Sequence, residues 1–193
     1  MKKKINHHLI FEGAELSGKS FIMSEIYNFL EKKYNQSKDV LDGCHWINAD
    51  IGIFGTPNGK KIIHSYLEIL KTLINSNVII EKFHISDSVY SQIYKKRAIK
   101  YNEVEKKLHD MSTKIVFLSI DENTKLVKKR LQDRIRLYPH YKRIAKKPEW
   151  YLKQQALYRQ ALSTTKLPFI TVDTSKLPNK QVIHQILNFI GEN

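Results

Sequence analysis

The residues with the clearest chemical meaning lie near the start of the chain, where a short apolar run ends in a loop bracketed by glycines. Gly13 is followed by four residues and then by Gly18-Lys19-Ser20. This spacing is typical of a phosphate-binding P-loop, in which backbone N–H groups surround phosphate oxygens, the lysine reaches the β- and γ-phosphates and the hydroxyl ligates Mg²⁺. The loop predicts ATP and Mg²⁺ as ligands, with nucleotide contacts from Gly13, Ala14, Glu15, Leu16, Ser17, Gly18, Lys19, Ser20 and Phe21.

A carboxylate and a cation follow a second apolar run, Val78-Ile79-Ile80. Glu81 comes directly after this run, at the position where P-loop proteins carry an acid that helps to hold Mg²⁺. A carboxylate at the end of a strand can instead cap the next helix. We predict that Ser20 and Glu81 bind the metal and that Lys82 offers a cation to a phosphate group.

Basic residues crowd the segment from 130 to 147. Arg130 and Arg134 are four residues apart, so on a helix they share a face. A basic segment that closes over bound ATP can neutralise charge on the transferring phosphoryl group, which is worth on the order of 10³-fold or more in rate. The segment predicts a lid over about 132–149. We expect catalytic roles for Arg130, Arg134 and Arg136 from this region and for Lys19 from the P-loop. The alternative is a solvated helix face in a basic protein.

The expected elements alternate between strands and helices. Apolar runs predict strands at 7–12, 44–50, 78–80, 115–120 and 169–172. Apolar positions at helical spacing predict helices at 19–34, 62–74, 86–108 with a break near 100–102, 123–137, 148–161 and 183–190. Since parallel strands need crossover helices, the pattern predicts a three-layer α/β fold of the P-loop NTPase class, with a parallel sheet of about five strands in a single domain over 1–193. The P-loop, Glu81-Lys82 and Asp121 all follow strand ends and should meet in one crevice.

The composition sets outer limits on partners and location. The 193 residues are enough for one sizeable core, and the 33 lysines and arginines against 19 acidic residues give a formal charge of +14. Such a charge favours polyanions and leaves nucleic acid open as a partner, although a solvated lysine-rich surface explains it equally well. The single cysteine, Cys44, excludes an internal disulfide. No apolar run has the length of a membrane helix, so we expect a cytoplasmic protein without a membrane partner.

Several stretches resemble the thymidylate kinase family. Phe11–Ser20 is similar to that family's Phe/Ile-Glu-Gly-x-Asp/Glu-Gly-x-Gly-Lys-Thr/Ser loop, and Glu81–Tyr90 is similar to its Asp-Arg-Tyr-x-x-Ser-x-x-Ala-Tyr motif. The second stretch is closer still to the Asp-Arg-Phe-His-x-Ser-Glu-x-Val-Tyr form found in phage and virus members. Leu118–Asp121 with Leu131–Arg134 resembles the strand and helix before the family's lid, and Trp150–Tyr158 resembles its aromatic-to-tyrosine helix. The resemblance covers most of the chain in the same order.

The resemblance implies a nucleoside-monophosphate-kinase type of fold with a basic lid, ATP and Mg²⁺ as cofactors and a small nucleotide or nucleoside as acceptor. It places Lys19 and Ser20 on ATP phosphates and Mg²⁺, and it places Arg130, Arg134 or Arg136 in the lid. The acceptor contacts that it implies come from Glu15, Lys82, Tyr90, Lys95 and Tyr158. A homodimer is left open.

Two positions depart from the family pattern. Lys82 stands where the family has an arginine, which removes a bidentate fork for phosphate, and Ser91 stands where it has the glutamine that meets thymine. The leading hypothesis is ATP-dependent phosphoryl transfer to a nucleotide or nucleoside, such as the deoxynucleoside monophosphate dTMP. The alternatives are a kinase for the 5′ end of a polynucleotide and an ATP-binding regulator with little turnover. A GTPase is disfavoured because the guanine-reading Asn-Lys-x-Asp is absent.

Overall fold

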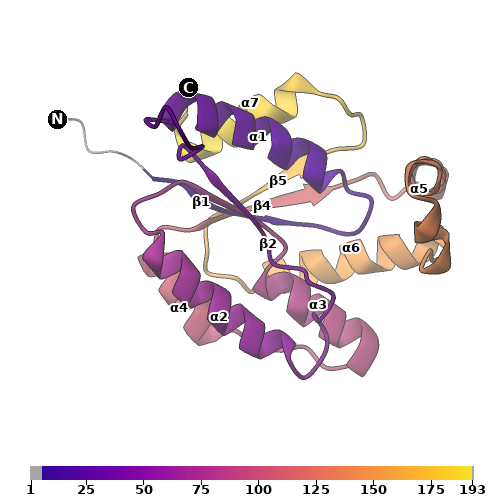
Figure 1. Ribbon diagram of the computed structural model, residues 1–193. Coiled ribbons are helices and arrows are strands. Elements are labelled where there is room, and N and C mark those ends of the chain that lie inside the picture. Colours follow the sequence, from indigo (N-terminus) through magenta and orange to yellow (C-terminus); the bar gives the residue numbers. More distant parts are fainter. Residues whose placement is uncertain (1–5, 193) are drawn as a thin grey trace.

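One parallel sheet forms the centre of the molecule. The computed structural model describes residues 6–192, so residues 1–5 and 193 lie outside the described part. Five strands pair in the order β2-β3-β1-β4-β5 (Figure 1). They are β1 (His8–Glu12), β2 (His45–Asn48), β3 (Val78–Glu81), β4 (Lys114–Ser119) and β5 (Phe169–Asp173). The three inner strands are almost fully buried, as expected for parallel strands covered on both faces.

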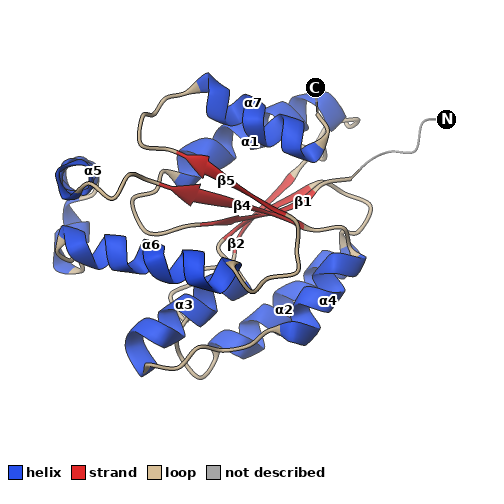
Figure 2. Ribbon diagram, turned by 180° about the vertical axis from the view of Figure 1, so that it is seen from behind, coloured by secondary structure: helices blue, strands red, loops and turns tan. Residues whose placement is uncertain are grey.

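Helices cover both faces of the sheet, which confirms the predicted three-layer fold (Figure 2). One face is covered by α1 (Lys19–Tyr34) and α7 (Lys180–Ile190). The other face is covered by α2 (Gly59–Thr72), α3 (His84–Lys95), α4 (Asn102–Asp110) and α6 (Pro148–Leu162). A third, smaller cluster joins α5 (Thr124–Leu137) to α6, and the 3₁₀ turn η1 (Pro139–Arg143) connects these two helices.

The amphipathic pattern of α1 explains why its residues form a helix against the sheet. Ile22, Ile26 and Leu30 recur every four residues, and all three are fully buried under the strands. The helix ends where Asn35 turns to an extended backbone conformation. The predicted bounds of 19–34 are therefore confirmed, and they fix the position of the loop that precedes the helix.

Three predicted elements need correction. The break expected near 100–102 in the helical segment 86–108 begins earlier, because Lys96 adopts a left-handed φ of 55° that ends α3, and the chain then runs irregularly to α4. The strand expected over 44–50 is confined to His45–Asn48, and its last ladder bond is donated by the N–H of Ala49 to the carbonyl of Glu81. Helix α2 begins at Gly59, three residues earlier than predicted.

The strand order creates a crevice at the carboxyl ends of the inner strands. β1 lies between β3 and β4, so the chain builds β2 and β3 on one side of it and β4 and β5 on the other. Ligands of open α/β sheets bind where the order changes direction in this way. The loop that follows β1 and the Glu81 side chain at the end of β3 both lie there. No helix within residues 6–192 is long and apolar enough to cross a membrane.

Candidate active site

The loop between β1 and α1 requires glycine at two places. Gly13 has a φ of 151°, and a Cβ there would lie 2.6 Å from the carbonyl oxygen of Leu118. Gly18 has a φ of 81°, and a Cβ there would lie 2.6 Å from a methyl carbon of Leu177. L side chains rarely adopt either conformation, so both strain and space exclude larger residues. The backbone is thereby held in the tight curve that the P-loop spacing predicts.

Leu16 takes a left-handed conformation without being a glycine. Its φ is 67°, and its buried side chain packs with Val127 and Tyr151 of the cluster between α5 and α6. Arg130 donates from Nη1 to the Leu16 carbonyl oxygen at 2.9 Å. Packing and this charged hydrogen bond hold a backbone that costs about 1 kcal/mol for a non-glycine residue.

Lys19 points back into the loop that it follows. Its Nζ donates to the carbonyl oxygens of Gly13 and Ala14, each at 2.9 Å. Burial, together with the nearby charge of Lys82, lowers the pKa of Lys19 from 10.5 to about 8. The ammonium group thus lies in the curve of the loop, held by backbone oxygens, where an anion would add a stronger partner.

Ser20 and Glu81 come together as predicted. The Ser20 hydroxyl donates to Oε1 of Glu81 at 3.4 Å, across the gap between the start of α1 and the end of β3. One hydroxyl and one carboxylate suit Mg²⁺, which in such sites takes few protein ligands beside phosphate oxygens and water. Residues 6–192 contain no group of three or more His, Cys, Asp or Glu side chains placed to hold a metal by themselves. This pair therefore fits a metal that arrives with a phosphate-bearing ligand.

Two hollows are lined by different residues of the loop. The first, which we call the P-loop groove, has a volume of about 590 Å³ and is lined by Lys19, Ser20, Phe21, Arg134, Tyr138 and Ser175 among others. The second, which we call the Glu15 cavity, has a volume of about 380 Å³ and is lined by Glu15, Asp50, Tyr90, Tyr94, Arg143, Lys146 and Trp150 among others. The loop therefore contributes to both a larger groove and a smaller, more aromatic cavity.

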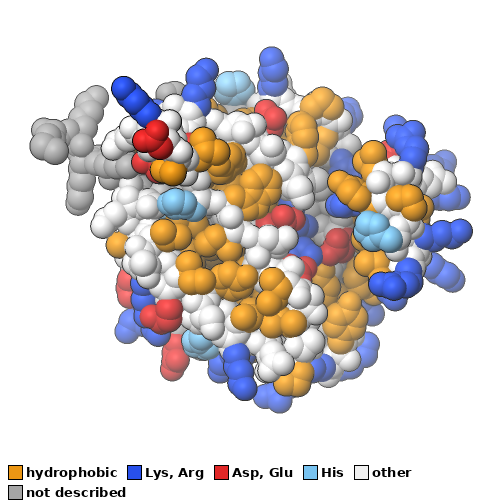
Figure 3. All heavy atoms as spheres, viewed as in Figure 1, with side chains coloured by type: hydrophobic (Ala, Val, Ile, Leu, Met, Phe, Trp, Pro, Cys, Tyr) orange, Lys and Arg blue, Asp and Glu red, His pale blue; other side chains and the backbone are white. Residues whose placement is uncertain are grey.

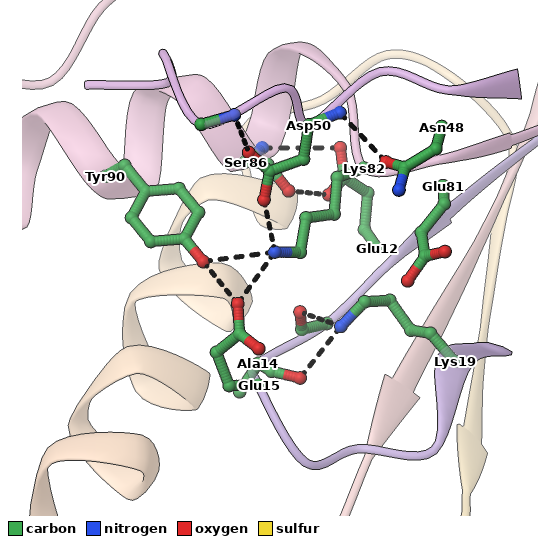
Figure 4. A network of polar contacts seen from close by, with 12 residues as sticks. Glu12, Ala14, Glu15, Lys19, Asn48, Asp50, Glu81, Lys82, Ser86 and Tyr90 are labelled. Atoms are coloured by element: carbon green, nitrogen blue, oxygen red, sulfur yellow. Dashed lines mark hydrogen bonds and ion pairs between the residues drawn. The ribbon is translucent and has the colours of Figure 1, made fainter. Parts of the chain in front are cut away.

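Lys82 is buried beside the Glu15 cavity, and it contacts three side chains that line the cavity without lining it itself. Its Nζ donates to Glu15 at 2.7 Å, to Asp50 at 2.5 Å and to the Tyr90 hydroxyl at 3.2 Å, and the Tyr90 hydroxyl donates to Glu15 at 2.7 Å (Figure 4). Lys82 has a φ of 57°, and this unusual backbone turns its side chain toward the two carboxylates. The structure thus brings together the predicted residues Glu15, Lys82 and Tyr90.

The charges of this cluster fix its protonation states. Burial alone would raise the pKa of Glu15, but the charges of Lys82 and Lys19 outweigh burial and lower it to about 2. Burial likewise favours a neutral Lys82, yet Glu15, Tyr90 and Asp50 hold its pKa well above 10.5. At neutral pH Lys82 is therefore charged and Glu15 is ionised.

Glu12, at the end of β1, holds the start of α3. It is fully buried, and its carboxylate accepts hydrogen bonds from the N–H groups of Phe83 and Ser86 and from the Ser86 hydroxyl, at 3.0, 3.3 and 2.5 Å. These donors belong to the first turn of α3, so Glu12 fixes that helix against β1. Burial raises the pKa of Glu12.

Two further predicted acceptor residues are not among those that line the Glu15 cavity. Tyr158 is fully buried: its ring stacks on Phe117, and its hydroxyl is 2.7 Å from that of Ser86. It therefore belongs to the core beneath α3. Lys95 lies exposed in the last turn of α3.

The three predicted arginines have different surroundings. Arg134 lines the P-loop groove, with its guanidinium 5.3 Å from the ring of Tyr138 and 5.7 Å from the ring of Tyr141. Arg130 also borders the groove, but its guanidinium is engaged by the carbonyl oxygens of Leu16 and Thr174. Arg136 belongs to α5, around which lysine and arginine side chains gather (Figure 3). It is largely exposed, it pairs with Asp133 one turn earlier, and it is not among the residues that line the groove. Only Arg134 has the placement that a lid cation requires.

Several contributors were missed from the sequence. Asp50 follows the end of β2, so the rule that sites form at strand ends could have found it. Arg143 and Lys146 lie in the basic lid and line the Glu15 cavity from that side. Gln154 gives no sequence signal, yet its Oε1 accepts the N–H of Glu15 at 2.9 Å. Its neighbour Gln155 exchanges two 2.8 Å bonds with the backbone of Ile120.

Comparison with known proteins gives the fold its context. No protein-family model and no curated protein sequence matches the chain. Among solved structures it resembles the YorR protein of Bacillus subtilis in complex with phosphorylated GDP, with a TM-score of 0.65 and 22% identity over 94% of each chain. It also resembles deoxyadenosine kinase from M. mycoides with bound dATP, with a TM-score of 0.54 and 17% identity over 95% of this chain and 98% of that one. The chain therefore has the three-layer α/β fold of P-loop nucleotide kinases along nearly its whole length.

Proposed function

We propose that this protein transfers the γ-phosphoryl group of ATP to a nucleotide or nucleoside bound in the Glu15 cavity. The observation that carries the proposal is the loop that lines two hollows, with Lys19 and Ser20 in the P-loop groove and Glu15 in the Glu15 cavity. Such a loop places a donor phosphate in one hollow and an acceptor in the other, within the reach of a single set of charges. The structural neighbours with bound nucleotides support the same reading of the fold.

The charges of the Glu15 cavity favour a monophosphate as acceptor. Glu15 and Asp50 already neutralise Lys82, so the cations that remain for an acceptor phosphate are Arg143 and Lys146 of the lid. The rings of Tyr94 and Trp150 offer flat surfaces for a base. A deoxynucleoside monophosphate such as dTMP is thus the first acceptor to test.

Catalysis at this site would consist of positioning and charge neutralisation. An oxygen of the acceptor phosphate forms a bond to the γ-phosphorus, the bond to the β–γ bridging oxygen breaks, and ADP leaves. Because a phosphate acceptor is already an anion, no general base is needed. Lys19 and Arg134 would neutralise the transferring group, and Ser20 and Glu81 would hold Mg²⁺, whose charge offsets that of the phosphates.

A transfer assay with labelled ATP tests the proposal. All common nucleosides and nucleoside monophosphates are offered with ATP and Mg²⁺, and we expect a labelled product from at least one deoxynucleoside monophosphate. ATP binding is measured in parallel by calorimetry. If ATP binds but labelled product stays at background with every acceptor, the protein is a nucleotide-binding regulator and not a kinase.

Arg130 and Arg134 are expected to differ when each is replaced by alanine. Arg134→Ala should lower kcat by about 10²- to 10³-fold with little change in thermal stability, because its guanidinium faces the groove. Arg130→Ala should lower the free energy of unfolding by about 1–3 kcal/mol, because two carbonyl oxygens lose a charged donor. Rates and urea unfolding of both variants check this. Equal kinetic losses at equal stability would contradict the distinction.

A further inference from the structure

The Glu15 cavity continues into a groove that the proposed reaction does not use. Two hollows of about 360 and 390 Å³ lie along α3 and α6, and we call them together the seam groove. Trp150 lines both the Glu15 cavity and the nearer hollow, and Gln92 lines both the nearer and the farther hollow. The cavity and the two hollows are therefore neighbours, with Trp150 shared by the first two and Gln92 shared by the last two.

The groove follows the contact between two packed helices. Its α3 wall is formed by Ile85, Ser88 and Gln92, which recur every three or four residues and so form one stripe of the helix, and by Lys96 directly after the helix ends. Its α6 wall is formed in the same way by Lys153, Leu157 and Gln160, with Thr164 just beyond the end of the helix. Low residue numbers on α3 meet high ones on α6, so the helices run antiparallel. The 12 residues of α3 give the groove a length of about 18 Å.

Cations are spaced along the groove. Lys153 of α6 and Lys96, directly after α3, line the nearer hollow, and Lys100 lines the farther one. Arg143 and Lys146 line the Glu15 cavity at the near end. The acid in the farther hollow, Glu105, is engaged by the Thr165 hydroxyl at 2.6 Å and the Lys166 N–H at 3.2 Å, among other partners. The positive charges thus continue outward from the acceptor end of the site.

Gln154 adds an unmatched donor beside the nearer hollow. Its Oε1 is committed to the Glu15 N–H, so turning the amide around would lose that bond. Its Nε2 is buried and has no hydrogen-bond partner among the described residues. Buried amide groups are rarely left unpaired in native proteins. An unmatched donor next to Trp150 and two lysines suits a ligand that brings an acceptor atom, a flat ring and a negative charge.

We propose that the seam groove binds a short single strand of nucleic acid whose terminal nucleotide occupies the Glu15 cavity. This rests on the proposed function, because it takes the Glu15 cavity as the acceptor site. Spaced cations that track a backbone, with flat side chains beside them, are the usual means of holding a single strand. The second nucleotide lies in the nearer hollow against Trp150, with phosphates between Lys153 and Lys96. The third reaches toward Lys100.

Charge reversal at the groove tests the proposal. Lys96→Glu and Lys153→Glu are compared with Lys128→Glu, an exposed position on α5 that lines none of these hollows. The probes are a fluorescent 5′-hydroxyl deoxytetranucleotide and the matching deoxynucleoside monophosphate. Each groove variant should weaken tetranucleotide binding at least tenfold more than monophosphate binding. Each should also reduce the slope of log affinity against log salt by about 0.7, whereas Lys128→Glu should change both ligands alike.

A second measurement locates the strand. The protein has two tryptophans, so a Trp46→Phe background leaves Trp150 as the fluorescent reporter. The tetranucleotide should quench this fluorescence, and the monophosphate should compete for the strand's terminal position. Equal affinity for strand and monophosphate, or equal losses in Lys96→Glu and Lys128→Glu, would overturn the proposal. So would sedimentation showing a dimer that Lys153→Glu separates, since the groove would then be an interface between copies.

The outcomes keep this proposal apart from the proposed function. Strand binding that depends on Lys96 and Lys153, with no transfer to any acceptor, would support the groove and refute the kinase. Transfer to a monophosphate, with strand binding that is unchanged in Lys96→Glu and Lys153→Glu, would support the kinase and refute the groove.

Discussion

Lys19→Ala is expected to lower phosphoryl transfer by at least about 10³-fold while the protein stays folded. Lys19 makes its hydrogen bonds to the carbonyl oxygens of Gly13 and Ala14, so its ammonium lies where the β- and γ-phosphates would be cradled. A preorganised cation at a transferring phosphoryl group contributes to the transition state far more than to folding. Initial rates with labelled ATP, and circular dichroism melting of the same samples, check both parts of the prediction.

Glu81→Gln provides a comparison for this variant. It retains the size of the side chain and removes the charge that lies 3.4 Å from the Ser20 hydroxyl. We expect it to raise the Mg²⁺ concentration needed for activity while ATP binding without metal is unchanged. Transfer by Lys19→Ala within a few-fold of wild type would remove Lys19 from the reaction. Equal losses of Mg²⁺ dependence and ATP binding in Glu81→Gln would assign that carboxylate to structure.

Lys82→Met is expected to change both the stability of the protein and its response to acid. The variant leaves the carboxylates of Glu15 and Asp50 near each other without their shared cation. Both side chains are about one-fifth to one-quarter exposed, so we expect a loss of about 2 kcal/mol at pH 7, below the cost for a fully buried pair. Acceptor binding should fall with it, because Glu15 then keeps the Tyr90 hydroxyl but loses the ammonium that orients its carboxylate.

The direction in which pH changes the stability follows from the pKa of Glu15. In the wild type the pKa of Glu15 is lowered to about 2, so its contribution to stability is present above about pH 4.5 and is lost as the pH falls toward 2. In Lys82→Met the pKa of Glu15 rises, and this acid-side loss becomes smaller, because Lys19 and Tyr90 are then the groups that lower this pKa. Lys82→Arg is the control, since it keeps the cation. Urea unfolding between pH 3 and 7 checks all three proteins; the same acid profile in Lys82→Met would contradict the role of the cluster.

The fold was predictable because strong signals agreed. Val78-Ile79-Ile80 is a fully buried parallel strand, and the glycine spacing at 13 and 18 leaves few backbones other than a tight loop before a helix. The strand ends then placed Glu15, Glu81 and Lys82 in one crevice. Local pattern and topology favoured the same answer for these residues, which is why they were found.

The errors have a common physical origin in long-range contacts. Arg130 shares a helix face with Arg134, but the carbonyl of Thr174, 44 residues away, engages its guanidinium. Tyr158 carries the same polar group as Tyr90, and only the packing against Phe117 decides that it is buried in the core. Spacing along one helix cannot report partners that come from other elements, and so it cannot separate structural cations and hydroxyls from functional ones.

Two residues near the loop carry unusual backbones for side chains of their size. Leu16 has a φ of 67°, so glycine would relieve strain there. Lys82 has a φ of 57° and meets two carboxylates with a single ammonium. Packing holds the first of these side chains, and ion pairs hold the second.

The consecutive amides of α6 have a consequence for how the two ligands influence each other. Gln154 accepts the N–H of Glu15 and Gln155 exchanges hydrogen bonds with the backbone of Ile120, so α6 is fastened both to the P-loop and to the end of β4. If the lid shifts α6 when ATP binds, Glu15 must move with that helix. Binding coupling is reciprocal: if ATP changes the affinity of the acceptor by some factor, the acceptor changes the affinity of ATP by the same factor.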